Sequence, residues 1–308
     1  MRVAVVDIGS NSTRLLIAEV DPEDGTVEEL VRRSTVTRLG HGVDATGALD
    51  DESVERTWRV LESYRWAIDE NECEANIAVL TSAVRDASNG AIFAERVRSE
   101  LSLDAKVLSG DEEAQLTFLG AMAGRPPAVE PTVVIDIGGG STEFTVGTGR
   151  TAGFHVSTPA GVVRMSERHI HSDPPAPDEV QALGEDTERV FVEHIPEDER
   201  LPVKQGIAVA GTATSAASIE LELDPYDPAK VHGHILLLAT VEFLLARLSG
   251  MTEEERREVV GLNPDRAPTI VAGMVLLSQA MMVMDLESVE VSEHDILYGG
   301  ALRLAGLG

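Results

Sequence analysis

The sequence has few of the features that mark secreted, membrane-spanning or nucleic-acid-binding proteins. Cys73 is its only cysteine, which excludes an internal disulfide and fits a reducing compartment. No apolar run is long enough to span a bilayer, and the chain begins with an expected strand rather than with a signal peptide. These absences predict a cytoplasmic protein that does not act on a membrane.

Positive charge is scarce as well. The 308 residues include 53 acidic and 25 basic side chains, so the formal net charge is −28, and lysine occurs only at positions 106, 204 and 230. This charge disfavours nucleic acid and anionic membranes as partners. It also disfavours an anionic substrate, unless arginines and a divalent metal gather locally. We interpret the acidity as a solvated surface of the kind expected of a salt-rich habitat or a high-GC lineage.

What the sequence does contain is one motif that occurs twice. An apolar, β-branched run ends in Asp-Ile-Gly and turns into a second apolar run, at residues 3–18 and again at residues 133–146. Such runs are typical of buried strands, and turn glycines let backbone N–H groups approach a ligand. A carboxylate in that turn would repel a phosphate unless a cation lay between them. Asp136 with its glycines therefore predicts a site for a metal-bound phosphate.

The repeat also predicts the domain organisation. A strand follows each turn, whereas a helix would follow in a dinucleotide fold. Two copies at this distance predict two domains of related design, residues 1–125 and 126–308, each offering a phosphate turn to a shared cleft. The proline-rich segment 125–131 is the expected domain boundary. The last helix of the chain could pack back on the first domain. The alternative is a pair of ordinary hairpins. The length suits two domains.

Three further candidates lie in the first half. Arg38 stands in a loop among glycines and would contact a phosphate or face solvent. Arg85 follows a buried strand at 77–80, at the strand end where α/β folds bind ligands; it would clamp an anion or pair with Asp86. Glu113 lies one step inside an acidic helix start and could face the cleft, where it would orient and deprotonate a water. Asn89 is expected to cap the helix that ends near residue 101.

In the second half, Gly211 and Thr212 follow an expected strand and open a helix, a geometry that suits an anion on helix N–H groups. Arg266 stands in a loop before another helix start. Residues 235–248 are expected to be one helix. The histidine pairs 169/171 and 232/234 lack a carboxylate or cysteine spaced to complete a transition-metal site, which favours surface or hydrogen-bonded histidines.

Taken together, the motifs resemble the exopolyphosphatase / guanosine pentaphosphate phosphohydrolase family of the actin–hexokinase superfamily. The matching segments are 7–12, 81–89, 109–114, 136–143 and 211–214, in the family's order and over essentially the whole chain. The resemblance implies an α/β fold of two ribonuclease H-like domains, with mixed sheets flanked by helices and a central cleft. The chain looks like the short form, without the C-terminal helical domains of longer members. Homodimers are usual in the family.

The resemblance also implies roles for single residues. Glu113 would activate the attacking water, Glu143 would hold the metal or the water, and Arg85 would contact the phosphate. Asp7, Asp136 and Glu143 would bind Mg²⁺ or Mn²⁺. The remaining phosphate contacts would come from Ser10, Asn11, Ser12, Gly138, Gly139, Gly140 and Ser141, and, as weaker matches, from Arg38 and Arg266.

The expected function is metal-dependent hydrolysis of the terminal phosphoanhydride of polyphosphate. The sequence does not choose among polyphosphate, guanosine pentaphosphate and nucleoside triphosphates, nor does it indicate a chain-length preference. Two rivals stay open: a kinase of the same fold, and a non-catalytic sensor of guanosine tetraphosphate or polyphosphate.

Overall fold

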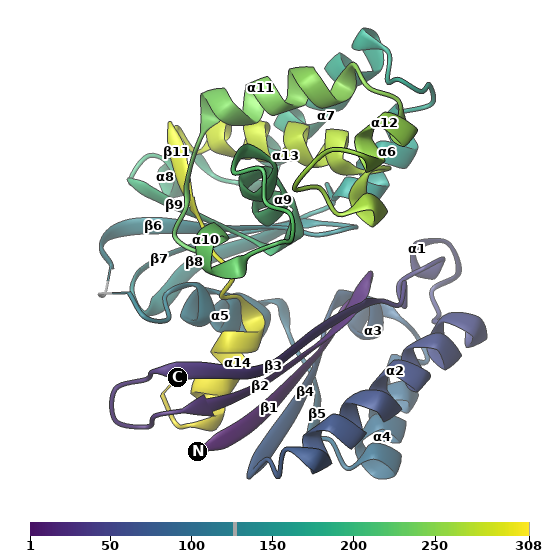
Figure 1. The fold of residues 1–308 in the computed structure, drawn as a ribbon, viewed down its shortest axis with the longest axis vertical. Coiled ribbons are helices and arrows are strands. Elements are labelled where there is room, and N and C mark those ends of the chain that lie inside the picture. The colour runs from purple at the N-terminus through teal and green to yellow at the C-terminus, as the bar shows by residue number, and fades with distance from the viewer. Residues whose placement is uncertain (126–127, 308) are drawn as a thin grey trace. The chain divides into compact units, whose positions relative to one another are not determined.

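The computed structural model describes residues 1–125 and 128–307 and divides the chain into two compact units. The first consists of Met1–Pro126 with His294–Gly308, and the second of Pro127–Glu293. Pro126 and Pro127 of the predicted linker lie outside the described residues. Each unit is built on one mixed sheet flanked by helices (Figure 1), so the α/β class is confirmed.

The sheet of the first unit has the order β3-β2-β1-β4-β5. β1, β2 and β3 are antiparallel neighbours, whereas β4 and β5 continue the sheet parallel to β1. Its strands are β1 (Arg2–Ile8), β2 (Ser12–Val20), β3 (Val27–Val36), β4 (Ala75–Leu80) and β5 (Ala105–Val107). Its helices are α1 (Val43–Thr46), α2 (Asp51–Glu70), α3 (Ser82–Asp86), α4 (Gly90–Leu101), α5 (Gly110–Ala121) and α14 (Ile296–Leu304).

Both faces of this sheet are covered, because successive side chains of a strand point to opposite faces. Ala4, Val6 and Ile8 join a core with α2 and α4. Val3 and Val5 join a second core with α5 and α14 (Figure 1). By this alternation, Asp7 points to the face that α5 and α14 cover.

The second unit has a sheet of the order β10-β11-β9-β6-β7-β8. Its strands are β6 (Ala128–Ile137), β7 (Thr142–Gly149), β8 (Thr151–Thr158), β9 (Gln205–Val209), β10 (Ile235–Leu237) and β11 (Ser288–Val291). Its helices are α6 (Val162–His169), α7 (Pro177–His194), α8 (Glu197–Arg200), α9 (Ala210–Glu220), α10 (Pro228–Val231), α11 (Leu238–Ser249), α12 (Glu253–Arg257), the 3-10 turn η1 (Pro264–Arg266) and α13 (Ile270–Val283).

One core fills the helix-covered side of this sheet. Val133, Ile135 and Ile137 of β6 pack into it together with side chains of α7, α9, α11 and α13. Asp136, by alternation, points to the opposite face. The two corresponding hairpins therefore differ. Asp7 points toward helices α5 and α14 of the first unit, whereas Asp136 points away from the core helices of the second unit.

Two local predictions were wrong. Ile235–Leu237 is not helical but pairs antiparallel with β11, and the helix begins only at Leu238. A short apolar run fits either structure, and here the open sheet edge takes it. Asn89 does precede α4, but its side chain does not cap the helix; it exchanges two hydrogen bonds of 2.9 Å with the backbone of Leu49.

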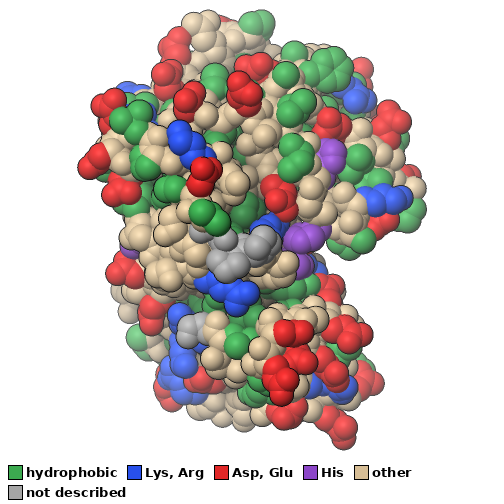
Figure 2. All heavy atoms as spheres, turned by 90° about the vertical axis from the view of Figure 1, so that its left-hand side faces the viewer, with side chains coloured by type: hydrophobic (Ala, Val, Ile, Leu, Met, Phe, Trp, Pro, Cys, Tyr) green, Lys and Arg blue, Asp and Glu red, His purple; other side chains and the backbone are tan. Residues whose placement is uncertain are grey.

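Acidic side chains are scattered over the surface seen in Figure 2 rather than gathered in one patch, as a solvated surface would have them. In the described part of the chain, no helix has both the length and the apolar character that a membrane crossing requires.

Candidate active site

In the turn between β1 and β2, the backbone carbonyls accept hydrogen bonds, whereas two of the backbone N–H groups face no acceptor within residues 1–125 and 128–307. The N–H of Gly9 donates to the Ser12 carbonyl at 3.0 Å. The carbonyls of Ser10 and Asn11 accept N–H groups of residues 37, 38 and 40, just after β3. Among the described residues, no acceptor binds the N–H groups of Ser10 and Asn11. Amides arranged in this way can bind an anion.

Asp7, at the end of β1, is part of a buried ion-pair network. Its cross-strand partner in register is Arg14, which donates to Asp7 Oδ2 from Nε at 2.9 Å and from Nη2 at 2.6 Å. Arg14 Nη1 also binds Asp295, which accepts the N–H of Leu297 at the start of α14. The C-terminal helix is thereby tied to the first turn.

Burial and the shared arginine act in opposite directions on these two acids. Burial raises the pKa of Asp7 more than Arg14 lowers it. Burial also acts to raise the pKa of Asp295, but Arg14, Arg32 and the N–H of Leu297 outweigh it and lower that pKa. We therefore assign the more firmly ionised carboxylate to Asp295.

Arg85 and Glu113 form the second feature of the first unit. Arg85 Nη1 donates to Glu113 Oε2 and to the Leu108 carbonyl, each at 3.0 Å. Asp86, the predicted alternative partner, is more distant: its Oδ1 lies 3.7 Å from Arg85 Nε. Ser82, at the start of the same short helix, shares a hydrogen bond of 3.0 Å with the Ser10 hydroxyl. The structure thus links the first turn, Arg85 and Glu113 at the carboxyl ends of β1, β4 and β5.

The helix that carries Glu113 is firmly started. Ser109 and Glu112 form a capping box, in which the Ser109 hydroxyl accepts the N–H of Glu112 and the Glu112 carboxylate accepts the N–H of Ser109. Glu112 is therefore occupied by the helix start, whereas Glu113 points to Arg85.

Arg38 is exposed and has a positive φ of 51°, an uncommon backbone state for a side chain other than Gly, Asn or Asp. Its N–H and that of Thr37 both donate to the Asn11 carbonyl. The backbone strain at Arg38, of order 1 kcal/mol, therefore lies in a residue that binds the first turn. Strained residues of this kind often occur at functional sites.

The second turn repeats the pattern of the first. The N–H of Gly138 donates to the Ser141 carbonyl at 2.9 Å. The Gly138 and Gly139 carbonyls accept the N–H groups of Val162 and Val163, each at 2.9 Å. For the described residues, no acceptor is found for the N–H groups of Gly139, Gly140 and Ser141.

The charge at this turn differs from that at the first. Glu143 is the cross-strand partner of Asp136, in the register position that Arg14 occupies opposite Asp7. Glu143 Oε1 accepts the hydroxyls of Ser141 at 2.6 Å and Ser157 at 2.7 Å. Side chains so paired are near neighbours, so the second turn places two acids where the first places an acid and an arginine.

The start of α9 lies beside the second turn, because β9 runs parallel to β6 and Val209 is the register partner of Asp136. Ala210 has a positive φ of 62° and is followed by Gly211. A Cβ placed on Gly211 would overlap the Arg266 guanidinium, so the end of that side chain lies directly against Gly211. Thr212 is buried. The structure therefore brings Gly211, Thr212 and Arg266 together.

Several residues at these turns were not predicted. Arg14 could have been predicted from the pairing of the two strands, which places it opposite Asp7. Asp295 is 281 residues away from Arg14, so no local pattern in the sequence indicates it. A Cβ on Gly161 would overlap the backbone of residues 139–141, and one on Gly140 would lie 3.8 Å from Arg164 Nη2. Ser157 and Arg164 thus join the second turn.

Carboxylates at the two turns are the groups that could hold a divalent metal ion. In the described part of the chain, no three His, Cys, Asp or Glu side chains are arranged to hold a metal. Mg²⁺, however, often takes one or two carboxylates and completes its shell with water and substrate phosphates. Asp136 and Glu143 suit that arrangement. Asp7 suits it less, because Arg14 already engages its Oδ2.

Comparison with known proteins decides the family. A sequence profile of the Ppx/GppA phosphatase family matches residues 16–303. The chain is 35% identical to Exopolyphosphatase 2 of Mycobacterium tuberculosis, over 99% of both chains. The chain belongs to the Ppx/GppA phosphatase family. The predicted family is confirmed, and with it a phosphoanhydride hydrolase at the level of the family.

Solved structures of Ppx/GppA proteins agree. The family member from Aquifex aeolicus superposes with a TM-score of 0.87 at 32% identity, over 100% of this chain and 99% of that one. An exopolyphosphatase from Cytophaga hutchinsonii gives a TM-score of 0.86 at 27% identity, over 100% and 99% of the two chains. The predicted α/β fold with mixed sheets flanked by helices is confirmed, and these Ppx/GppA structures share it.

Proposed function

We propose that this member of the Ppx/GppA phosphatase family is an exopolyphosphatase, which hydrolyses the terminal phosphoanhydride of inorganic polyphosphate and releases orthophosphate. The observation that carries the proposal is the pair of hairpin turns whose carbonyls are held and whose amides have no acceptor among the described residues. The relatives named exopolyphosphatase support polyphosphate as the substrate.

In this proposal, the amides of Ser10, Asn11, Gly139, Gly140 and Ser141 bind phosphate oxygens. Arg85, Arg266 and, more weakly, Arg38 add positive charge where the transferred phosphoryl becomes more negative. Ser12 fixes the first turn through its carbonyl, and Gly211 and Thr212 contribute the start of α9.

Glu113 is the proposed general base. Its Oε2 accepts one hydrogen bond from Arg85, which would hold the carboxylate in place to accept a proton from the attacking water. Arg85 thus serves both the base and the phosphate. Because positioning dominates phosphoryl transfer, the rigid capping of α5 contributes to the rate.

Asp136 and Glu143 are the proposed Mg²⁺ ligands, with Mn²⁺ as a substitute and Asp7 as a weaker participant. The hydroxyls of Ser141 and Ser157 orient the Glu143 carboxylate. When bound, the ion would neutralise phosphate charge and polarise the transferred phosphoryl.

The decisive experiment measures phosphate release from short polyphosphate, long polyphosphate, guanosine pentaphosphate and ATP with Mg²⁺. The proposal expects polyphosphate to be the best substrate, and Glu113→Gln to lower the rate at least about a hundredfold. The control is Glu112→Gln, because glutamine still serves a capping box. Preference for guanosine pentaphosphate would reassign the substrate, and tight binding without release would favour a sensor. An unchanged rate in Glu113→Gln would refute the proposed base.

A further inference from the structure

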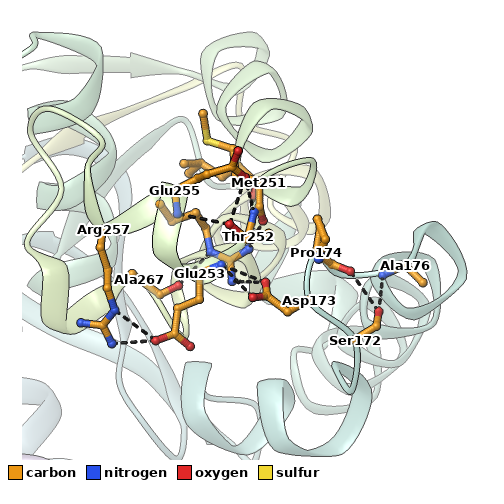
Figure 3. A network of polar contacts seen from close by, with 12 residues as sticks. Ser172, Asp173, Pro174, Ala176, Met251, Thr252, Glu253, Glu255, Arg257 and Ala267 are labelled. Carbon is orange, nitrogen blue, oxygen red and sulfur yellow. Dashed lines mark hydrogen bonds and ion pairs between the residues drawn. The ribbon is translucent and has the colours of Figure 1, made fainter.

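Arg256 is a buried guanidinium in α12, only 4% exposed. Its Nε donates to the Ala267 carbonyl at 3.0 Å, and its Nη1 donates to the Met251 carbonyl at 2.7 Å and to that of Leu248 at 3.4 Å. Asp173 lies 3.6 Å from Nη2. Asp173, Met251 and Ala267, labelled in Figure 3, belong to three different segments of the second unit. A buried charge is costly unless it is paired and hydrogen-bonded, so each of these contacts matters.

The acid in this network also fixes the helix. Both carboxylate oxygens of Asp173 accept the N–H of Glu253, at 2.8 and 3.0 Å, at the first residue of α12 (Figure 3). Thr252 caps the same helix start with Glu255. Arg256 is therefore held on a fixed short helix rather than on a free loop.

The neighbouring arginine binds the same loop from the exposed side. Arg257 Nη1 donates to the Pro264 carbonyl at 3.2 Å, while its Nε and Nη2 bind Glu253 at 3.1 and 2.6 Å. Two consecutive arginines thus bind the carbonyls of Pro264 and Ala267. These carbonyls bracket Arg266, and we call the two contacts the Arg256–Arg257 clamp.

The clamped residue lies against the candidate phosphate site. Arg266 lies so close to Gly211 that a Cβ there would have to displace its guanidinium. Gly211 stands in the first turn of α9, where the helix dipole is positive and disfavours a cation. A guanidinium held at that position suits an anion bound by the arginine and the helix amides together.

We infer that Arg256 is a positioning residue for substrate binding: it fixes residues 264–267 so that the Arg266 guanidinium stays over Gly211. The inference rests on the proposed function, in which Arg266 contacts a substrate phosphate. Arg256 itself is turned toward backbone carbonyls and Asp173, so it acts through the loop. Arg257 has the same role with a single loop contact.

The test is a double-mutant cycle of Arg256→Lys with Arg266→Gln, assayed with tripolyphosphate and Mg²⁺. Lysine keeps the charge but cannot reproduce the guanidinium's several bonds. The inference expects Arg256→Lys to raise KM at least about tenfold with kcat changed less than about threefold, since lost ground-state and transition-state binding alike appear in KM. In the Arg266→Gln background, the same change should raise KM less than about twofold. Arg247→Lys, at an exposed arginine of α11, is the matched control.

Other outcomes separate the possibilities. Equal effects of Arg256→Lys in both backgrounds, or an unchanged KM, would overturn the inference and leave Arg256 with a purely structural role. If Arg256→Lys does not fold, Arg257→Gln takes its place, with a smaller rise in KM that must also vanish in Arg266→Gln. Tripolyphosphate affinity by calorimetry follows the same cycle without turnover. If the wild-type protein is inactive but the tripolyphosphate affinities of the cycle are still non-additive, the proposed reaction is refuted and the role of the Arg256–Arg257 clamp is supported.

Discussion

In the first hairpin the residue opposite the terminal aspartate is Arg14, and in the second it is Glu143. The two turns are otherwise built alike: the first glycine donates to the carbonyl three residues on, at 3.0 and 2.9 Å, and the segment after the third strand binds the turn carbonyls. The comparison teaches that backbone geometry and charge are set independently. At the first turn the residue opposite the aspartate is basic, whereas at the second it is another acid.

The difference extends to what each aspartate anchors. Asp7 is buried and reaches α14 through Arg14 and Asp295, so the first turn is part of the packing of its unit. Asp136 is half-buried and lies on the sheet face opposite the core helices. We therefore expect stability to depend more on the first turn and metal binding more on the second.

Removing Arg14 should give the largest effect on folding. Arg14→Gln leaves Asp7 and Asp295 buried without their shared cation, which should lower the free energy of unfolding by about 3 kcal/mol, measured by urea denaturation. Arg33→Gln, at an exposed arginine of β3, should change it by less than about 0.5 kcal/mol. A loss below about 1 kcal/mol for Arg14→Gln would mean that the first turn does not depend on this pair.

The glycines that support the turns come next. A Cβ on Gly161 would overlap backbone atoms of residues 139–141, whereas one on Gly40 would meet the Ser10 Cβ at 2.9 Å. Gly161→Ala should cost roughly 2 kcal/mol of stability by overpacking and should reduce phosphate release more than Gly40→Ala does. Gly153→Ala, whose Cβ would lie 3.7 Å from its nearest neighbour, is the control. Equal losses in all three variants would break the comparison.

Glu143 tests the assignment of the metal to the second turn. Glu143→Gln should raise the Mg²⁺ concentration for half-maximal phosphate release at least about tenfold, because one of two carboxylate ligands becomes neutral. Mn²⁺ binding followed by electron paramagnetic resonance should weaken in parallel. Glu130→Gln, on the exposed part of β6, should change neither. Unaltered Mn²⁺ affinity in Glu143→Gln would move the metal away from this turn.

Ser157 should give the smallest effect. Ser157→Ala removes one of the two hydroxyls that Glu143 accepts and leaves Ser141 in place. A single hydrogen bond contributes on the order of 1 kcal/mol net, so the Mg²⁺ requirement should rise roughly fivefold. The same titration measures it. A shift as large as that of Glu143→Gln would show that the orientation of the carboxylate, rather than its charge, governs the site.

Much of this arrangement could be predicted from sequence because it is local. The repeated Asp-Ile-Gly motif predicted both turns, and Glu113 was singled out because it lies one step inside an acidic helix start. The partners of these residues could not be predicted in the same way. Arg14 meets Asp295 only through tertiary packing, and Gly161 reaches the second turn from beyond β8. Residues 235–237 were misassigned because pairing with β11, rather than local preference, decides their structure.

The account depends most directly on the turn amides as phosphate-binding groups. Backbone ¹H–¹⁵N shifts of the perdeuterated protein, recorded with a non-hydrolysable triphosphate and Mg²⁺, would test this claim residue by residue. We predict the largest shifts at Ser10 and Asn11 and at Gly139, Gly140 and Ser141. Saturable binding that leaves the amides of both turns unshifted would contradict the account.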